Sequence, residues 1–166
     1  MIKNQRGFSL TELMVVVAVI GIMGMIAVPT LVTALPGYRL KSSAKDLCSS
    51  MRKARSLAIK QNRSVSIEFN AAAKTYSIDG GTPAELPDGI SFGHGNATKP
   101  AGSAASLPSD GISFVDDKVT FTTQGFSGGS GYVYLQNAKG QAYAIRATTS
   151  GSIRMRQWAG NDWTGQ

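Results

Sequence analysis

The sequence predicts an α+β fold in which a long N-terminal helix precedes a small antiparallel β-domain. An apolar run from Leu13 to Val28 is long enough to be a candidate membrane helix. Apolar residues then recur at alternating four- and three-residue spacing from Arg39 to about Gln61, which is typical of an amphipathic helix. After Arg63 the period changes to two, as in strands that bury one face.

The apolar segment carries a single charge. Lys3 and Arg6 precede it, which predicts a cytoplasmic N-terminus. Between Arg6 and Arg39 the only charged side chain is Glu12. A carboxylate costs about 2.5–3.5 kcal/mol at the centre of a membrane helix and less near the interface, so we expect Glu12 to have a partner. Pro29 is expected to kink or locally melt the helix, because its ring clashes with the carbonyl four residues earlier.

The segment Arg6-Gly7-Phe8-Ser9-Leu10-Thr11-Glu12, followed by the apolar helix, resembles the N-terminus of type IV pilins and type II secretion pseudopilins. The resemblance implies that residues 1–7 are a prepilin leader, cleaved after Gly7 by a prepilin peptidase, and that the new Phe8 amine is N-methylated. It also implies that Glu12 pairs with the Phe8 ammonium of a neighbouring subunit during filament assembly. A nearby cation would offset the cost of desolvating the carboxylate. The alternative is a simple membrane anchor with Glu12 at the headgroup level.

The positive charge is concentrated in one segment. The formal net charge is +7. From Pro36 to Arg63 eight basic residues accompany one acidic residue, whereas from Ser64 to Gln166 seven basic residues accompany eight acidic ones. We expect the basic helix surface to be solvated, or else to face acidic patches of adjacent subunits or anionic lipid. The opposite, apolar stripe is expected to lie on the β-domain and consists of Leu40, Ala44, Leu47, Met51, Ala54 and Ala58.

Together with the apolar and charge patterns, the resemblance implies a division of the chain into a leader over 1–7, a transmembrane or filament-core helix over 8–35, and a periplasmic pilin domain over 36–166. The last part comprises the amphipathic helix 39–61 and a β-domain over 64–158. Cys48 is the only cysteine, so no intrachain disulfide can form, and we expect it in the core. The Gly-, Ala-, Ser- and Pro-rich stretch 93–111 predicts a mobile loop. Short strands are expected at 65–69, 76–78, 90–92, 112–115, 118–122, 132–137, 142–148 and 152–158.

Motifs in the β-domain narrow the resemblance. They resemble the minor pilins of the GspH/FimT family, whose fold is type IV pilin-like, a long N-terminal helix on a β-sandwich of two small antiparallel sheets. The resemblance implies a place at or near the filament tip. It also implies partners among other pilins or pseudopilins and the inner-membrane assembly platform. The motifs are Gln124-Gly125-Phe126, Gly131-Tyr132-Val133-Tyr134-Leu135, Tyr143-Ala144-Ile145 and Gly151-Ser152-Ile153-Arg154.

A hairpin near the C-terminus carries candidate DNA-binding residues. FimT-type members contribute to DNA uptake and carry a Gly-Arg-x-Arg motif, in which Ser152 here replaces the first arginine. A three-residue hairpin loop would pair Arg146 with Arg154, and like charges directly opposite each other are destabilising. An anionic ligand would relieve this repulsion, so Arg146, Arg154, Arg156 and Trp158 are candidate nucleic-acid contacts. The alternative is a solvated strand face with Trp158 on the arginine stems. The same register buries Ile145, Ala147, Ile153 and Met155.

The sequence favours a protein without enzymatic activity, cofactor or metal. The only histidine, His94, lies in the Gly-rich loop, and no nucleophile-elbow or phosphate-binding motif occurs. Three functions remain. The first is a minor pilin or pseudopilin that helps to initiate or cap a filament for protein secretion or pilus biogenesis. The second is a pilus-tip DNA-binding subunit for DNA uptake. The third is a single-pass inner-membrane protein with a periplasmic C-terminal domain outside any filament.

Overall fold

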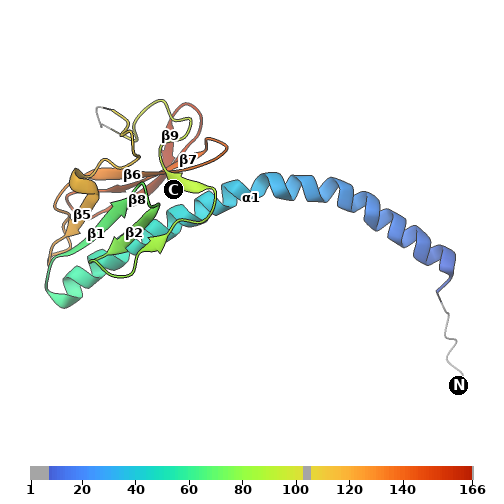
Figure 1. Ribbon diagram of the computed structural model, residues 1–166, viewed down its shortest axis with the longest axis horizontal. Helices are drawn as coiled ribbons and strands as arrows, with labels where there is room; N and C mark the ends of the chain where they lie inside the picture. The colour runs from blue at the N-terminus through green and yellow to red at the C-terminus, as the bar shows by residue number, and fades with distance from the viewer. Residues whose placement is uncertain (1–7, 103–105, 166) are drawn as a thin grey trace, which may run out of the picture. The chain divides into compact units, whose positions relative to one another are not determined.

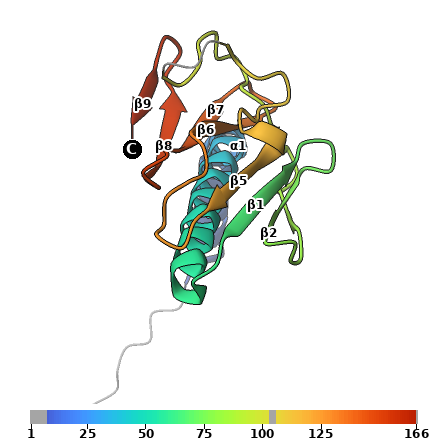
Figure 2. The same cartoon turned by 90° about the vertical axis from the view of Figure 1, so that its left-hand side faces the viewer.

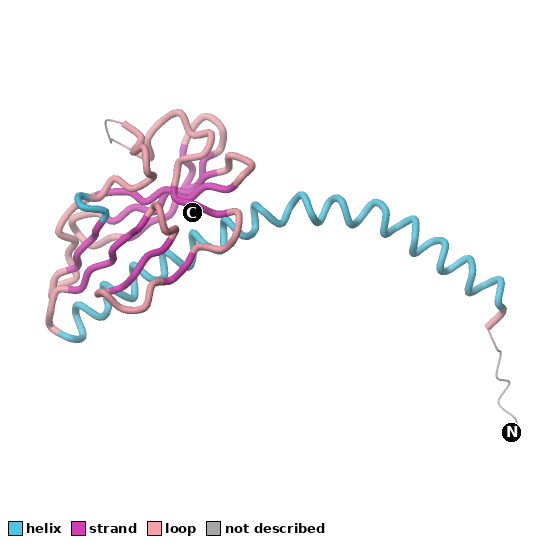
Figure 3. The backbone as a smooth tube through the Cα atoms, in the orientation of Figure 1, coloured by secondary structure: helices cyan, strands magenta, loops and turns pink. Residues whose placement is uncertain are grey.

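The computed structural model describes residues 8–102 and 106–165. A single helix, α1 (Leu10–Gln61), is followed by short strands and one 3-10 helix (Figures 1 and 3). The chain divides into two compact units between Leu35 and Pro36, so α1 contributes to both. The remaining elements are β1 (Val65–Asn70), β2 (Thr75–Ile78), β3 (Ala84–Glu85), β4 (Ile90–Phe92), η1 (Val115–Asp117), β5 (Lys118–Phe121), β6 (Gly131–Asn137), β7 (Ala142–Ala147), β8 (Ile153–Trp158) and β9 (Trp163–Gly165).

The first unit contains the apolar part of α1. Nearly every residue from Leu10 to Ile26 is exposed. Among the described residues, no single helix is long and apolar enough to pass as a membrane span, but the segments Leu10–Ile26 and Leu31–Gln61 pass together across a break. The break contains Pro29, the residue expected to interrupt the helix.

The second unit encloses one core between α1 and two antiparallel sheets. One sheet has the strand order β3-β2-β1-β5 and the other β4-β6-β7-β8-β9. In Figure 2, β1 and β2 lie on one side of α1 and β8 and β9 on the other. The expected fold, a long helix packed on two small antiparallel sheets, is confirmed.

The apolar stripe of α1 supplies the centre of this core. Its six predicted members, from Leu40 to Ala58, are fully buried. They join a cluster that includes Ile67 from one sheet and Ile145 from the other. Because burial of a Leu or Met side chain is worth about 1.5–3 kcal/mol, the stripe is a major source of stability for the second unit.

Most predicted strands occur within two residues of their expected ends, but the strand predicted at 112–115 is wrong. Ile112 makes only an isolated bridge to Val133, and η1 follows at once. Val115 already belongs to η1, and the positive φ values of Asp116 and Asp117, 54° and 50°, turn the chain before β5. Two strands were not predicted, β3 and β9. Strand β9 carries the β-domain beyond the expected end at 158, because Trp163 pairs with Trp158.

Cys48 lies in the core, as predicted, with 4% of its surface exposed. Burial raises the pKa of its thiol above the usual value, against a smaller opposing effect of Arg52. Because the thiolate is the reactive form, we expect iodoacetamide to label Cys48 much more slowly in the folded chain than in guanidinium chloride at the same pH. Equal labelling rates, followed by mass spectrometry, would contradict this packing.

Candidate functional site

The N-terminal site predicted from the sequence is only partly within the described residues. The leader 1–7, including Gly7, lies outside them. Phe8 is the first described residue and is 74% exposed. Helix α1 begins two residues later, at Leu10, and Glu12 lies in its first turn.

Glu12 presents a free carboxylate. Its side chain is exposed, and among the described residues no hydrogen bond or ion pair engages it. A negative charge in the first turn of a helix interacts favourably with the unpaired N–H groups there. Ser9 and Glu12 also have the spacing of a capping box, a signal that the sequence analysis missed, although Ser9 Oγ lies 3.1 Å from Thr11 Oγ1 in the structure. The carboxylate is therefore compatible with the helix end and available to a cation from another molecule.

The surroundings of Glu12 are apolar and uncovered. Leu10 is 76% exposed, Leu13 57% and Met14 63%. The exposed apolar surface continues along α1 to Ile26, and a contiguous apolar surface of this kind marks a membrane or protein interaction site. The charge of Glu12 would therefore be desolvated together with its partner wherever this surface is buried.

The predicted register of the C-terminal hairpin is confirmed. Arg146 lies opposite Arg154 and Ile145 opposite Met155. The Thr148 N–H donates to the Ser152 carbonyl at 3.0 Å and closes the three-residue loop. The four residues expected on the inner face, Ile145, Ala147, Ile153 and Met155, are all buried.

The arginines of this hairpin have different surroundings. The Arg146 guanidinium lies 5.4 Å from the centre of the Tyr132 ring, within the range of a cation–π interaction. Its buried Nε has no hydrogen-bond partner. Arg154 is exposed and Arg156 half-buried. All three arginines thus remain on the outer face of the sheet as predicted, with Arg146 already held by an aromatic ring.

Trp158 is not a free aromatic surface. It is only 8% exposed, and its ring centre lies 5.4 Å from that of Trp163. Little of the ring is therefore left to stack on a base, in contrast to the candidate role of Trp158 as a nucleic-acid contact. The contact with Trp163 was not predictable, because no strand was expected beyond residue 158.

On the outer face of the sheet, Trp158 and Trp163 form an aromatic cluster with Tyr132 and Tyr134. Part of the loop 93–111 covers this cluster. The Ala101 N–H donates to the Tyr134 hydroxyl at 3.0 Å, and Trp163 Nε1 donates to the Lys99 carbonyl at 2.7 Å. Ala97 and Ala101 are buried there. The described part of the loop is therefore anchored to the outer face of the sheet, in contrast to the mobile loop expected from composition.

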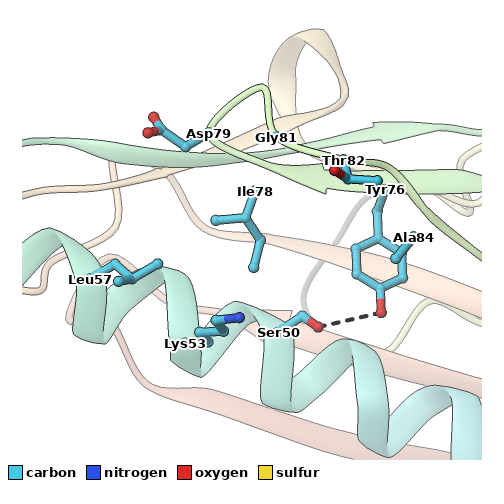
Figure 4. A pocket seen from close by; sticks show the side chains of 9 residues that line it. All are labelled: Ser50, Lys53, Leu57, Tyr76, Ile78, Asp79, Gly81, Thr82 and Ala84. Atoms are coloured by element: carbon cyan, nitrogen blue, oxygen red, sulfur yellow. Dashed lines mark hydrogen bonds between the residues drawn. The ribbon is translucent and has the colours of Figure 1, made fainter.

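A pocket lies between α1 and the β2–β3 hairpin. Figure 4 shows Tyr76 and Ile78 pointing from the sheet toward α1, where the Ser50 and Tyr76 hydroxyl oxygens are 3.3 Å apart. The pocket has a volume of about 520 Å³. Asp79, at its edge, forms an ion pair with Arg63. Its walls are mainly apolar, with the Lys53 ammonium as the one cation among the lining residues.

The described residues show no arrangement suited to a metal ion. Among residues 8–102 and 106–165, no three His, Cys, Asp or Glu side chains are grouped so as to hold a metal ion. His94 is half-buried, and its Nδ1 has no hydrogen-bond partner.

Two family models match the chain, one at its N-terminus and one over most of the second unit. Residues 2–28 match the prokaryotic N-terminal methylation motif, and residues 43–152 match the family Type II transport protein GspH. Type II secretion system protein H of Xanthomonas campestris pv. campestris is 29% identical over 85 residues, which are 51% of this chain and 50% of that protein. The chain thus spans about half the length of this curated relative.

Two solved structures show a weaker likeness. The type IV minor pilin FimU of Pseudomonas aeruginosa is 19% identical, with a TM-score of 0.48 over 69% of this chain and 85% of that one. The minor pseudopilin EpsH from the type 2 secretion system of Vibrio cholerae is 12% identical, with a TM-score of 0.49 over 70% and 95%. The GspH match, by contrast, extends over more than half of the 166 residues, and the chain belongs to the Type II transport protein GspH family.

Proposed function

We propose that this chain is a minor pseudopilin or pilin that enters, or initiates, a type II secretion pseudopilus or a type IV pilus. The observation that carries the proposal is an exposed apolar helix with a single unpaired carboxylate, Glu12, both of which lie within the residues that match the methylation motif. In an isolated water-soluble subunit this apolar surface would remain exposed to water, which is unfavourable. A subunit that moves from a membrane into a helical bundle buries it in both states.

The proposed processing follows the motif. A prepilin peptidase cleaves between Gly7 and Phe8, and the Phe8 amine is methylated. Residues 8–35 then anchor the subunit in the inner membrane, with the domain 36–166 in the periplasm. In the filament, Glu12 pairs with the Phe8 ammonium of a neighbour, and the other partners are further pilins and the inner-membrane assembly platform.

Family membership favours a role in type II secretion over a role in a type IV pilus. The matching family is described as a type II transport protein, and the Xanthomonas relative is a type II secretion system protein. We therefore place the chain in a secretion pseudopilus first and in a type IV pilus second. Deleting the gene should reduce export of secreted enzymes in the first case and surface piliation in the second.

Processing offers a direct test. We expect the mature protein from native membranes to begin at Phe8 and to carry one methyl group on its amine. Intact-mass analysis, with tandem sequencing of the N-terminal peptide, measures both. The Gly7→Ala variant should retain residues 1–7, because the cleavage junction is altered. A functional pool that keeps Met1 to Gly7 would contradict the proposal.

A further inference from the structure

The pocket between α1 and the β2–β3 hairpin, which we term the hairpin pocket, has uncovered apolar walls. Its volume of about 520 Å³ lies within the range of about 300–1,000 Å³ that is usual for binding sites. Leu57 and Ile78 line it and are only half-buried, so part of their apolar surface faces the open space. A partner with an apolar side chain would remove this surface from water.

Lys53 is the cation of the hairpin pocket and is exposed. All 10 acidic side chains of the sequence lie within the described residues, and no ion pair joins any of them to Lys53. The acidic residue of the lining, Asp79, is engaged by Arg63 instead. Glu85 follows Ala84 on β3, and since neighbouring residues of a strand face opposite sides, it points away from the pocket that Ala84 lines. The pocket is therefore suited to a carboxylate from another molecule.

The edge of β3 beside the pocket is poorly suited to an added strand. The Leu86 N–H donates to the Lys74 carbonyl at 2.9 Å, so the backbone groups of Leu86 point to β2. Because successive residues alternate, the outer edge carries the backbone groups of Pro83, Glu85 and Pro87. Proline has no N–H to donate, so only one of these three residues offers a donor. A partner of the hairpin pocket is thus recognised through side chains.

A projection of matching chemistry lies at η1, where the chain turns before β5. Val115 is 82% exposed, the highest value among the large apolar side chains of the described residues. Asp116 is exposed as well, and no ion pair engages it within the described part of the chain. The Lys118 N–H donates to the Val115 carbonyl, and Asp116 and Asp117 both have positive φ, which together fix the turn. We term Val115 and Asp116 the η1 knob.

The hairpin pocket and the η1 knob lie at opposite edges of one sheet. The pocket borders β2 and β3, whereas η1 runs directly into β5, and the strand order is β3-β2-β1-β5. Figure 2 shows β5, β1 and β2 side by side in that order. Since neighbouring strands are about 4.8 Å apart, β3 and β5 are separated by about 14 Å. The knob therefore cannot enter the pocket of its own chain, although it is accessible to the pocket of another copy.

We propose that the hairpin pocket binds the η1 knob of a second copy of this chain. Val115 of one copy covers the apolar walls of the pocket, and Asp116 pairs with Lys53 of the other copy. Each copy offers one pocket and one knob, so the contact is heterologous and can repeat from copy to copy. It joins the second units of two chains and does not depend on cleavage at Gly7 or on the Glu12 ion pair.

Zero-length cross-linking with a carbodiimide tests the contact, because this reagent joins a lysine amine to a carboxylate only where the two touch. The full-length chain in detergent micelles is prepared with and without an isotope label, and the two forms are mixed in equal amounts. We expect a product between Lys53 and Asp116 in which labelled and unlabelled peptides are joined. Lys118 and Glu68, which are 2.9 Å apart within one chain, provide the reference product and should join peptides of the same label only.

The Val115→Ser variant should lower the yield of the Lys53–Asp116 product about tenfold relative to the reference product, since the apolar contact supplies most of the affinity. Ile59→Ser is the matched control. Ile59 is an exposed β-branched residue of α1 that does not line the pocket, so its loss should leave the yield unchanged. Circular dichroism checks that each variant is folded. Glu12→Val should also keep the product, which separates this inference from the proposed function.

Exchange of the two charges gives a second measurement. Lys53→Glu and Asp116→Lys are made in separate chains and then mixed, so that the pocket of the first variant meets the knob of the second. We expect the carbodiimide to join the two introduced side chains. Lys60→Glu, mixed with Asp116→Lys, is the control, because Lys60 is exposed on α1 but does not line the pocket. This mixture should give no product between the introduced side chains.

Four results would overturn the inference. The first is the absence of a Lys53–Asp116 product when the reference product forms, and the second is a product that joins only peptides of the same label. The third is an equal loss of yield in Val115→Ser and Ile59→Ser. The fourth is an equal yield from the Lys53→Glu and Lys60→Glu mixtures, which would show that the basic surface of α1 attracts the knob without any role for the pocket.

Discussion

The Gly151→Ala variant should lose about 3 kcal/mol of unfolding free energy, as the sum of a strained backbone and a steric overlap. Gly151 has a φ of +77° in the turn between β7 and β8, a conformation that residues with a side chain rarely adopt. A Cβ at this position would overlap the carbonyl oxygen of Gly125 and would lie 3.0 Å from Arg55 Nε. Arg55 Nε itself donates to the same carbonyl at 2.9 Å. The methyl group therefore pushes apart three segments that meet at one point.

Gly80→Ala separates the two contributions. Gly80 has a φ of +68°, close to that of Gly151, but a Cβ there would meet no atom within 4 Å. We expect this variant to lose only the backbone contribution of about 1 kcal/mol. Urea unfolding of the full chain in detergent can be followed by the fluorescence of Trp158 and Trp163, which are both buried in the second unit. Equal losses in the two variants would show that the Gly125–Gly151 contact can relax.

The contact of Gly125 with Gly151 also explains two of the β-domain motifs. Gln124-Gly125-Phe126 and Gly151-Ser152-Ile153-Arg154 lie far apart in the sequence. In the structure the Ser127 N–H donates to the Thr149 carbonyl at 3.0 Å, so the two turns lie side by side. Glycine is needed at position 151 because a Cβ there would overlap the Gly125 carbonyl oxygen. It is needed at position 125 because the φ is +79° and a Cβ would lie 2.8 Å from Ile59 Cδ1 on α1.

Local periodicity predicted the parts of the fold that depend on a single element or hairpin. The stripe from Leu40 to Ala58 was evident because helical spacing alone selects the buried face. The pairing of Arg146 with Arg154 was evident because the loop length and the apolar alternation fix one register. Both predictions needed no information about distant residues.

The outer face of the larger sheet was not predictable in this way. Tyr134 and Trp158 alternate with inward-facing residues, so the pattern alone indicates exposure. Their burial depends on Trp163 and on the loop residues Lys99 and Ala101, which reach the cluster from distant parts of the sequence. Composition gave no sign of this, because a loop rich in Gly, Ala and Pro is typical of mobile segments as well.

The candidate functional residues can be divided in the same way, into those that local sequence predicts and those whose surroundings depend on tertiary contacts. Glu12 was predictable because it is the one charge in an apolar run, and this pattern needs no knowledge of the fold. The burial of Trp158 against Trp163, which removes its ring from the face of the arginines, is by contrast a tertiary fact.

The Glu12→Val variant is expected to insert into the membrane at least as well as the parent but to enter filaments at least about tenfold less. Membrane insertion becomes more favourable because a carboxylate that is costly in hydrocarbon is replaced by an apolar side chain. Incorporation into filaments decreases because, in the proposed filament, the Phe8 ammonium of the neighbour is left buried without its counter-ion. Breaking a buried pair in this way costs about 3–5 kcal/mol, against 1.4 kcal/mol for each factor of ten. Carbonate extraction measures insertion, and the amount of the chain in sheared filaments measures assembly.

Two further variants identify the cause. Glu12→Gln keeps the size and most of the polarity of the side chain but removes the charge, and it should fail as Glu12→Val does. Thr11→Val changes an exposed polar neighbour in the same turn, without any change in charge, and it should assemble normally. Because Glu12 also lies favourably at the helix N-terminus, a merely structural role of its charge predicts only a mild defect in the two Glu12 variants, well short of tenfold. Normal assembly of Glu12→Val would remove the cross-subunit ion pair from the proposed function. The membrane-anchor role of the apolar helix would then stand alone, since it needs no charge at this position.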